Sequence, residues 1–553
     1  MSLVADELVP DGALVLASLH KARRRNRLAN LDWFDAFYKA YLSGGGAALG
    51  IYAASGAIGD AAVRGGALAR VTHEGAAWLG ILVALVVAVG LRSGGRGGPL
   101  AFERAEVRHV LLAPVDRRDS IRRPALRRLQ HALFVGAATG AAGGILAVKR
   151  LPHLPVAWIA CGALFGAALG ALGFGTALIA GGVRLPRWAA DLCAMAVVGW
   201  SGIDVWQKTE TSPASMLAGV ALWPLRSDRW AFLGLAVALA VAVVGVLAVP
   251  GISMEAAERR SRLVGQLRFA ATLQDVRTVM VLQRQLAQEH VRQRPWVRLP
   301  AARRDGLRKD GKVALHVYLR RSLNGLLRWP ATRGLRLVLL AALAGVSVCG
   351  AWLGTTPLLV VAGLAMYVAA LDLLEPLSQE ADHPDRLRSV GRLRGTVTVH
   401  HLIVAYVVLL ALVVAAGIPA YVWGTPEVVV TLLPLAPTAA LLALGGAAVT
   451  VDRPPHVPSG SVETPEIAGA KFAWRVLMPP GLAVLGLVPL VPARHAWVHE
   501  HTAAAMNQHI SLAFSAILAC GTWAVMWVRY GEQIRETMTT MGANAISGEK
   551  SER

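Results

Sequence analysis

The sequence predicts an all-α integral membrane protein with about twelve transmembrane helices in two six-helix halves. Of its 553 residues, 55% are hydrophobic and only 16% are charged, which leaves too little charge for the surface of a soluble protein. The apolar residues gather in runs of about 20 residues, the length that crosses a bilayer as a helix. A short motif also occurs once in each half of the chain, which indicates two related halves.

Twelve apolar runs are separated by charged or Pro-rich segments. In the first half they cover residues 43–60, 76–92, 131–148, 155–182, 188–205 and 230–250. In the second half they cover residues 335–353, 356–374, 398–418, 427–450, 475–491 and 509–528. The predicted domains are therefore a first half over 1–250, a basic helical linker over 251–334, a second half over 335–528 and a tail over 529–553.

The basic residues that give the net charge of +21 are distributed according to the predicted topology. Arginines collect in alternate connections between the spans, chiefly 93–130 and 251–334, as the positive-inside rule requires of cytoplasmic segments. We therefore expect a lipid bilayer, and no nucleic acid, as the partner of this basic chain. The first 30 residues lack the pattern of a signal peptide, so we expect the N-terminus to stay in the cytoplasm. Twelve spans then return the C-terminus to the same side, and we expect the protein in the plasma membrane.

Three amphipathic segments are expected outside the spans. Residues 31–42 and 313–329 each precede the first span of a half and carry apolar residues at helical spacing, which favours helices lying in the membrane interface. The alternative for 31–42 is the beginning of the first span. Residues 253–293 contain no proline and predict a long cytoplasmic helix.

The repeated motif is Leu-Leu-x-Pro, at 111–114 and again at 373–376, each time behind the second span of its half. Proline suits the first turn of a helix, and a nearby acid favours the same end. We interpret each copy as a short helix that contacts a soluble partner, although a basic loop with a coincidental repeat is the alternative. The predicted partner-coupling residues are Leu111, Leu112, Pro114, Arg117, Arg118, Leu373, Leu374 and Pro376.

The first copy has a family resemblance. Gly98-Pro99-Leu100, Glu103 and the segment 111–118 are similar to the stretch between the second and third spans of ABC-2-type transporter permeases, where such a segment forms the coupling region. The two-half arrangement resembles large permease-like proteins of actinobacteria. The resemblance implies a transport subunit that exports its substrate and works with separate ABC-type ATPase subunits. The second copy departs from the family pattern, because residues 378–380 replace its Asp-Arg-Arg and no spacer separates it from the span.

We expect no cofactor and no catalytic residue in this chain, with ATP and Mg²⁺ bound on the partner subunit. The segment 306–313 satisfies GxxxxGK, but Val313 stands where a P-loop needs Ser or Thr for Mg²⁺. Four histidines surround Glu500 on the predicted outer side and suggest either a Zn or Cu site or solvated side chains, of which we expect the second. They are His495, His499, His501 and His509.

The positions of the acids in or near the spans distinguish between the possible transport mechanisms. Most stand near predicted span ends, where capping or ion pairing is expected, and Arg187 stands one helical turn from Asp191. These acids are Asp60, Asp191, Asp204, Asp372 and Glu375. A proton- or solute-coupled secondary transporter would need such acids deep in the membrane, and it remains the first alternative. A membrane scaffold or a membrane-embedded transferase is the second.

Overall fold

The computed structural model describes residues 63–95, 100, 117–253, 296–297, 308–309, 312–313, 315–381, 394–422, 426–451, 465–500, 504, 507–519 and 521–522, with scattered positions between 18 and 52. The chain forms two compact units, Met1–Phe269 and Ala270–Arg553. Their boundary falls inside the linker predicted at 251–334, and the four-part division of the chain stays a prediction.

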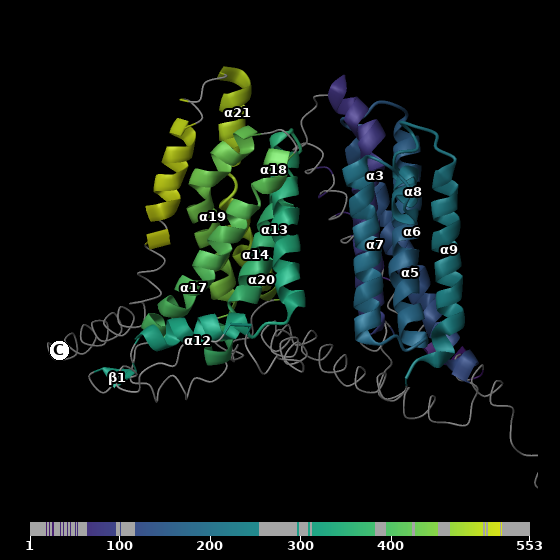
Figure 1. Cartoon of the computed structure of the whole chain (residues 1–553), viewed down its shortest axis with the longest axis horizontal. Helices are drawn as coiled ribbons and strands as arrows, with labels where there is room; N and C mark the ends of the chain where they lie inside the picture. The colour runs from purple at the N-terminus through teal and green to yellow at the C-terminus, as the bar shows by residue number, and fades with distance from the viewer. Residues whose placement is uncertain are drawn as a thin grey trace, which may run out of the picture. The chain divides into compact units, whose positions relative to one another are not determined.

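Unit 1 is a bundle of long apolar helices around a central helix, α6 (Figure 1). Helices α3, α5 and α9 all pack against α6, which begins at Pro155, a residue suited to the first turn of a helix. A nine-residue helix, α8, packs against α3, α6 and α9. The elements are α3 (Gly66–Gly94), α5 (Arg117–Val148), α6 (Pro155–Gly182), α7 (Arg187–Gln207), α8 (Pro213–Ala221), α9 (Trp230–Ala248) and the 3-10 turn η2 (Val249–Gly251).

Glycines bring the backbones of α5 and α6 into contact. A Cβ added at Gly140 would lie 2.0 Å from the carbonyl oxygen of Gly162, and one added at Gly166 would lie 2.0 Å from that of Gly136. No side chain fits at such distances, so these positions require glycine. Small residues are what membrane helices use for close packing, because lipid removes the hydrophobic drive between them.

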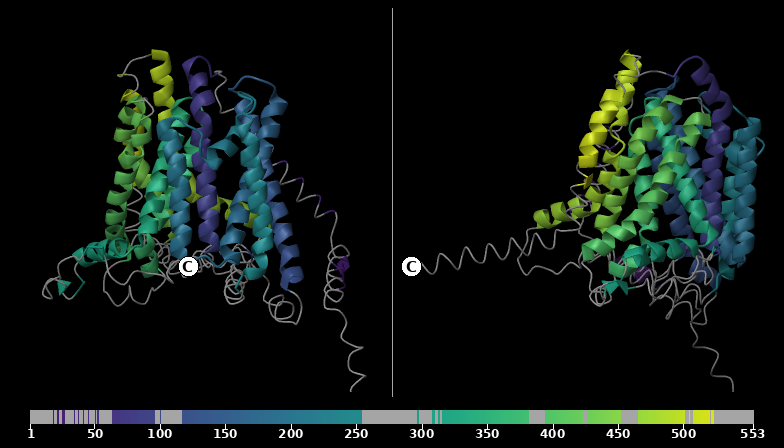
Figure 2. Two further views of the ribbon diagram at one scale, coloured as in Figure 1. Left: turned by 45° about the vertical axis from the view of Figure 1, so that its right-hand side comes forward. Right: turned by 60° about the vertical axis from the view of Figure 1, so that its left-hand side comes forward.

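Unit 2 is a second helical bundle that carries a helix across one end. Helix α12 runs crosswise below the long helices of its unit, next to a two-residue β-hairpin, in Figure 1 and again in Figure 2. The elements are β1 (Arg308–Lys309), β2 (Lys312–Val313), α12 (Leu315–Leu327), α13 (Ala331–Trp352), α14 (Leu358–Leu373), α15 (Glu375–Ala381), α17 (Arg394–Ala415), α18 (Ile418–Val422), α19 (Pro426–Val451), α20 (Pro465–Leu485) and α21 (Leu490–Glu500).

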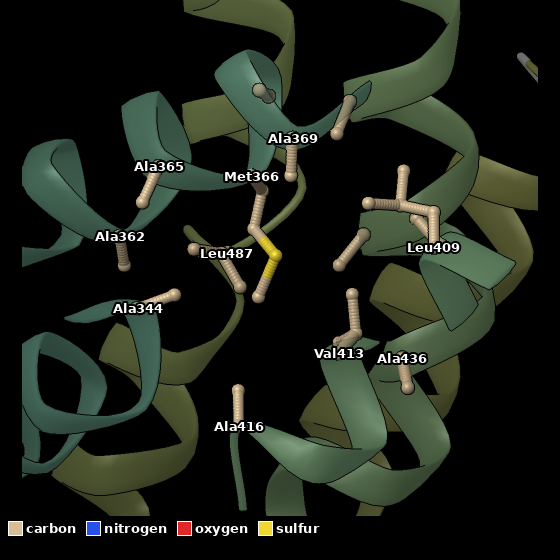
Figure 3. Close-up of a cluster of buried hydrophobic side chains, with 14 of the residues drawn as sticks. Ala344, Ala362, Ala365, Met366, Ala369, Leu409, Val413, Ala416, Ala436 and Leu487 are labelled. Atoms are coloured by element: carbon tan, nitrogen blue, oxygen red, sulfur yellow. The ribbon is translucent and has the colours of Figure 1, made fainter. Parts of the chain in front are cut away.

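The core of unit 2 contains alanines and larger apolar side chains in nearly equal numbers. Met366 of α14 lies among Leu409 and Val413 of α17 and Leu487, which follows α20 (Figure 3). Leu409 and Val413 have no exposed surface. The alanines of α13, α14 and α19 keep the helices close enough for this small core to fill the space between them.

The structure confirms a helical fold of membrane type. Nine helices of the described residues are long and apolar enough to cross a bilayer, or ten if α14 and α15, bent by 59°, form one span. The ten predicted spans from 76–92 to 475–491 each coincide with one of these. The predicted spans 43–60 and 509–528 lie outside or only partly inside the described residues, so the count of twelve stays a prediction.

The segments predicted outside the spans have mixed outcomes. A helix near 313–329 is confirmed as α12, whereas most of 31–42 and of the helix over 253–293 lie outside the described residues. The hairpin β1–β2 was not expected, because two-residue strands leave no pattern in hydropathy. Helix α8 was also not predicted, and it lies in the connection between the predicted spans 188–205 and 230–250.

Candidate functional site

The second copy of the repeated motif forms the bend between α14 and α15. Leu373 ends α14, and the backbone N–H of Leu374 donates to the carbonyl oxygen of Ala370. Pro376 is the second residue of α15, where its missing N–H costs no helical hydrogen bond. The short helix predicted from Pro376 is therefore present, and it changes the chain direction at the end of a span.

The leucines of this copy face the core of their own unit. Leu373, Leu374 and Leu377 are 2%, 1% and 3% exposed and belong to the hydrophobic core of unit 2. They fix α15 to the bundle, so a soluble partner cannot reach them without opening that core. Their role in partner coupling stays a prediction.

Each of three acids around the bend faces an arginine from a neighbouring helix. Asp372 pairs with Arg336 of α13, with 3.1 Å between Oδ2 and Nε. Glu375 pairs with Arg333 of α13, and Glu380 pairs with Arg321 of α12. The carboxylate of Glu380 is almost completely buried, and a buried charge requires such a partner. Capping or ion pairing was expected for Asp372 and Glu375, and the structure shows ion pairs for both.

A buried polar contact joins α12 to α17. Oγ of Ser322 lies 2.7 Å from Nδ1 of His401, and the ring of Tyr318 meets the imidazole edge to face at 5.6 Å. Ser322 and Tyr318 are four residues apart and share the inward face of α12. Neither residue was singled out from the sequence, and nothing in the sequence indicates the histidine that the two residues meet.

The far end of α12 is closed by a tryptophan from another part of the chain. The backbone N–H of Trp296 donates to the carbonyl oxygen of Leu327 (2.8 Å), and its Nε1 donates to that of Trp329 (2.7 Å). The last carbonyls of a helix lack partners within the helix. Trp296 supplies a donor to one of them, that of Leu327, and another to the nearby carbonyl of Trp329.

We call α12, α15 and the contacts Arg321–Glu380, Arg333–Glu375 and Ser322–His401 the α12–α15 clamp.

The first copy of the motif lies at the edge of what the structure describes. Leu111, Leu112 and Pro114 lie outside the described residues, and Arg117 and Arg118 begin α5 with side chains that are likewise outside them. Near the same end of unit 1, Asp191 of α7 pairs with Arg92 of α3 (2.9 Å). The sequence had pointed to Arg187, which lies on the same helix as Asp191.

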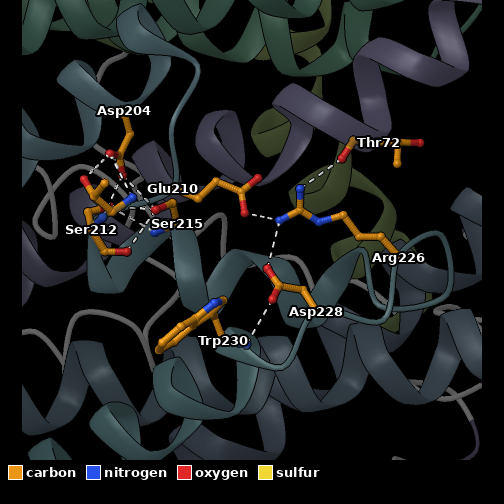
Figure 4. Close-up of polar contacts among 9 residues, drawn as sticks. Thr72, Asp204, Glu210, Ser212, Ser215, Arg226, Asp228 and Trp230 are labelled. Carbon is orange, nitrogen blue, oxygen red and sulfur yellow. Dashed lines mark hydrogen bonds and ion pairs between the residues drawn. The ribbon is translucent and has the colours of Figure 1, made fainter.

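A second polar cluster surrounds Asp204, near the end of α7 (Figure 4). The carboxylate is fully buried and accepts five hydrogen bonds. The donors are Thr211 Oγ1 (2.7 Å), Ser215 Oγ (2.7 Å), Ser212 N (2.9 Å), Thr211 N (3.1 Å) and Thr209 Oγ1 (3.2 Å). Ser212 also caps α8, accepting from the backbone N–H of Ser215. Asp204 thus organises the turn into α8 through hydrogen bonds, whereas capping or ion pairing was expected for the acids near the span ends.

Arg226 ties the segment after α8 to α3. Its guanidinium pairs with Glu210 and with Asp228 (3.2 Å), and it donates to the carbonyl oxygen of Thr72 (3.2 Å), as Figure 4 shows. Arg226 is only 22% exposed, which limits solvent screening of these pairs. Hydrogen bonds and ion pairs thus hold residues 204–228 together over one end of unit 1.

The other sites suggested by sequence gain little from the geometry. His495 and His499 do share a face of α21, with 4.1 Å between ring centroids, but no three metal-ligating side chains converge within the described residues. In the segment resembling a P-loop, Arg308 pairs with Val313 and Lys309 with Lys312 as antiparallel strands.

The chain matches no family model, no curated protein and no solved structure. The resemblance to ABC-2-type permeases therefore rests on the sequence motif alone. What the structure adds is a set of contacts: through the α12–α15 clamp, α12 is joined to α15 and α17, and α15 is joined to α13 and α14.

Proposed function

We propose that the chain is the membrane-spanning subunit of an ABC-type transporter, which exports a lipid, peptide or amphipathic metabolite. ATP and Mg²⁺ would bind to separate ATPase subunits. The observation that carries the proposal is the bend at the second Leu-Leu-x-Pro motif. There the short helix α15, at the end of a span, is held by one ion pair to the crosswise helix α12 and by another to α13.

The clamp supplies the connection that such a mechanism needs. In alternating access, ATP binding moves the contact helices and the spans reorient around the substrate. A helix attached only through apolar packing could slide under load. Directional contacts such as Arg321–Glu380 and Ser322–His401 resist sliding, because displacing them leaves buried polar groups without partners.

The two copies of the motif contribute unequally in this proposal. Leu373 and Leu374 are buried in their own unit, so the second half meets the ATPase through the outer surface of α12 and α15. In the first half, Leu111 and Leu112 seat in an apolar groove of the ATPase, with Pro114 starting the contact helix and Arg117 and Arg118 at its rim. This inequality agrees with the departure of the second copy from the family pattern.

We place the protein in the plasma membrane with both termini in the cytoplasm. The support is the concentration of arginines in alternate connections. Reporter domains fused at Arg303 should be cytoplasmic, and those fused at Lys208 should be external. A reversal of either fusion contradicts the twelve-span topology.

The main alternative is a proton- or solute-coupled secondary transporter, which needs titratable groups near the middle of the spans. Within the described residues the buried carboxylates are Asp204 and Glu380. The first lies one turn from the end of α7 with five hydrogen-bond donors, and the second lies in α15 with an arginine. A proton relay requires an unpaired acid near the middle of a span, and neither Asp204 nor Glu380 meets this requirement.

The proposal is tested by purifying the tagged chain from its native membranes in mild detergent. We expect a subunit with a P-loop ATPase sequence to accompany it, identified by mass spectrometry, and ATP hydrolysis that vanadate inhibits. A purified chain that is monodisperse but has neither the subunit nor the hydrolysis contradicts the proposal and favours the secondary transporter or the scaffold.

A further inference from the structure

Unit 1 contains an open groove of about 670 Å³ between α3 and α5, with α6 as its floor. Its walls are apolar and include Val86 and Val89 of α3, Val135 of α5 and Phe174 of α6. All three helices belong to candidate membrane spans. A groove between membrane-spanning helices faces the hydrocarbon of the bilayer, which favours an apolar occupant.

Two of the glycines that line the groove bring α3 and α5 close to α6. A Cβ at Gly90 would lie 2.1 Å from Oγ1 of Thr176, and one at Gly170 would lie 2.3 Å from the carbonyl oxygen of Ala132. The helices meet at these glycines, while the larger side chains stand on either side.

One end of the groove is polar and leads to a row of positive charge. Ser93 of α3 and His131 of α5 line this end. Arg127 and Arg123 precede His131 by one and two helical turns on the same face of α5, and all three side chains are exposed. These arginines stand at the end of α5 that is predicted to be cytoplasmic, where anionic lipid headgroups lie.

We propose that the groove binds one acyl chain of an anionic phospholipid of the surrounding bilayer, whose headgroup phosphate is held by Arg123, Arg127 and His131. An acyl chain matches the apolar walls, and a phosphate matches the cationic row. The acyl chain moves from the hydrocarbon of the bilayer to the apolar walls of the groove. The fit therefore comes from the shape of the groove, and the selectivity comes from the contacts with the headgroup. The inference goes beyond transport and does not depend on an ATPase.

The test uses the full-length chain in nanodiscs that contain a trace of phosphatidylglycerol with a diazirine in its acyl chain. After illumination, we expect labelled peptides to include residues 85–93 or 131–136. Val89 and Val135 are exposed and line the groove, so tryptophan at both positions should fill it. The double variant Val89→Trp/Val135→Trp should therefore lower this labelling about fivefold or more. Leu82→Trp is the matched control, because Leu82 is exposed on the same helix outside the groove.

A second arm tests the headgroup. The double variant Arg123→Gln/Arg127→Gln should reduce labelling by phosphatidylglycerol about threefold or more and leave labelling by the matching phosphatidylcholine unchanged. Lys149→Gln, just beyond the opposite end of α5, should change neither. Both double variants must elute as the unaltered chain does and melt at a similar temperature.

Two results would overturn the proposal. If folded protein carries no label at 85–93 or 131–136, the groove is covered by protein and holds no lipid. If phosphatidylglycerol and phosphatidylcholine label the unaltered chain equally, the cationic row does not select an anionic headgroup.

Discussion

Ser322 of α12 and His401 of α17 share a buried hydrogen bond, with 2.7 Å between Oγ and Nδ1. The two residues are only 3% and 2% exposed. The other imidazole nitrogen, Nε2, is buried without a hydrogen-bond partner among the described residues. The serine is thus the polar contact by which this histidine fastens the crosswise helix to a span.

Replacing Ser322 with Ala should therefore destabilise unit 2. The change leaves Nδ1 of His401 buried without this partner, which costs about 1–3 kcal/mol. Thermal unfolding in detergent, followed by intrinsic tryptophan fluorescence, measures the loss. Ser515→Ala, at an exposed position, should stay within about 0.5 kcal/mol of the unaltered chain. Equal melting of the two variants would show that the Ser322–His401 contact does not stabilise the fold.

The glycine contacts of α5 and α6 give a second prediction with a control on the same helix. Gly140→Ala places a Cβ 2.0 Å from the carbonyl oxygen of Gly162, so the helices must separate, at a cost of about 1–3 kcal/mol. Gly143 has nothing within 4 Å of its added Cβ. Gly143→Ala should therefore be neutral or stabilise by up to about 1 kcal/mol. Chemical unfolding of both variants measures the difference, and a destabilising Gly143→Ala would contradict this packing.

Asp204 provides a third prediction. Asp204→Asn removes the charge and presents an amide N–H₂ to groups that all donate hydrogen bonds, which should cost about 3 kcal/mol and loosen residues 208–228. Limited proteolysis together with thermal melting should detect both effects. Asp191→Asn, at a half-exposed ion pair, should cost less than about 1 kcal/mol. If the two variants behave alike, the five-donor cage is not what stabilises this end of unit 1.

The sequence was sufficient for the long helices because their apolar runs are continuous over the thickness of a bilayer. It was not sufficient for α8, a helix of nine residues that lies inside a connection and is buried only because α3, α6 and α9 surround it. The hydrophobic pattern of so short a segment does not distinguish a buried helix from an apolar loop.

The candidate site was predictable only in part, and for a related reason. Pro376 predicted where α15 begins, since the effect of proline on helix formation is local. The partners of the acids come from distant positions: Arg321 meets Glu380, and Arg92 rather than Arg187 meets Asp191. Such pairs depend on how helices pack, which a single sequence does not reveal.

The measurement that tests the central claim most directly is the amount of ATPase subunit that accompanies a tagged chain carrying Leu111→Asp and Leu112→Asp. We expect the subunit to be lost, because two carboxylates buried in an apolar groove without partners are strongly unfavourable. Arg117→Ala with Arg118→Ala is the matched comparison and should weaken association by only about 1 kcal/mol, since rim charges contribute little. Retention of the ATPase by a folded, membrane-inserted Leu111→Asp/Leu112→Asp chain would contradict the coupling role and the proposed transporter with it.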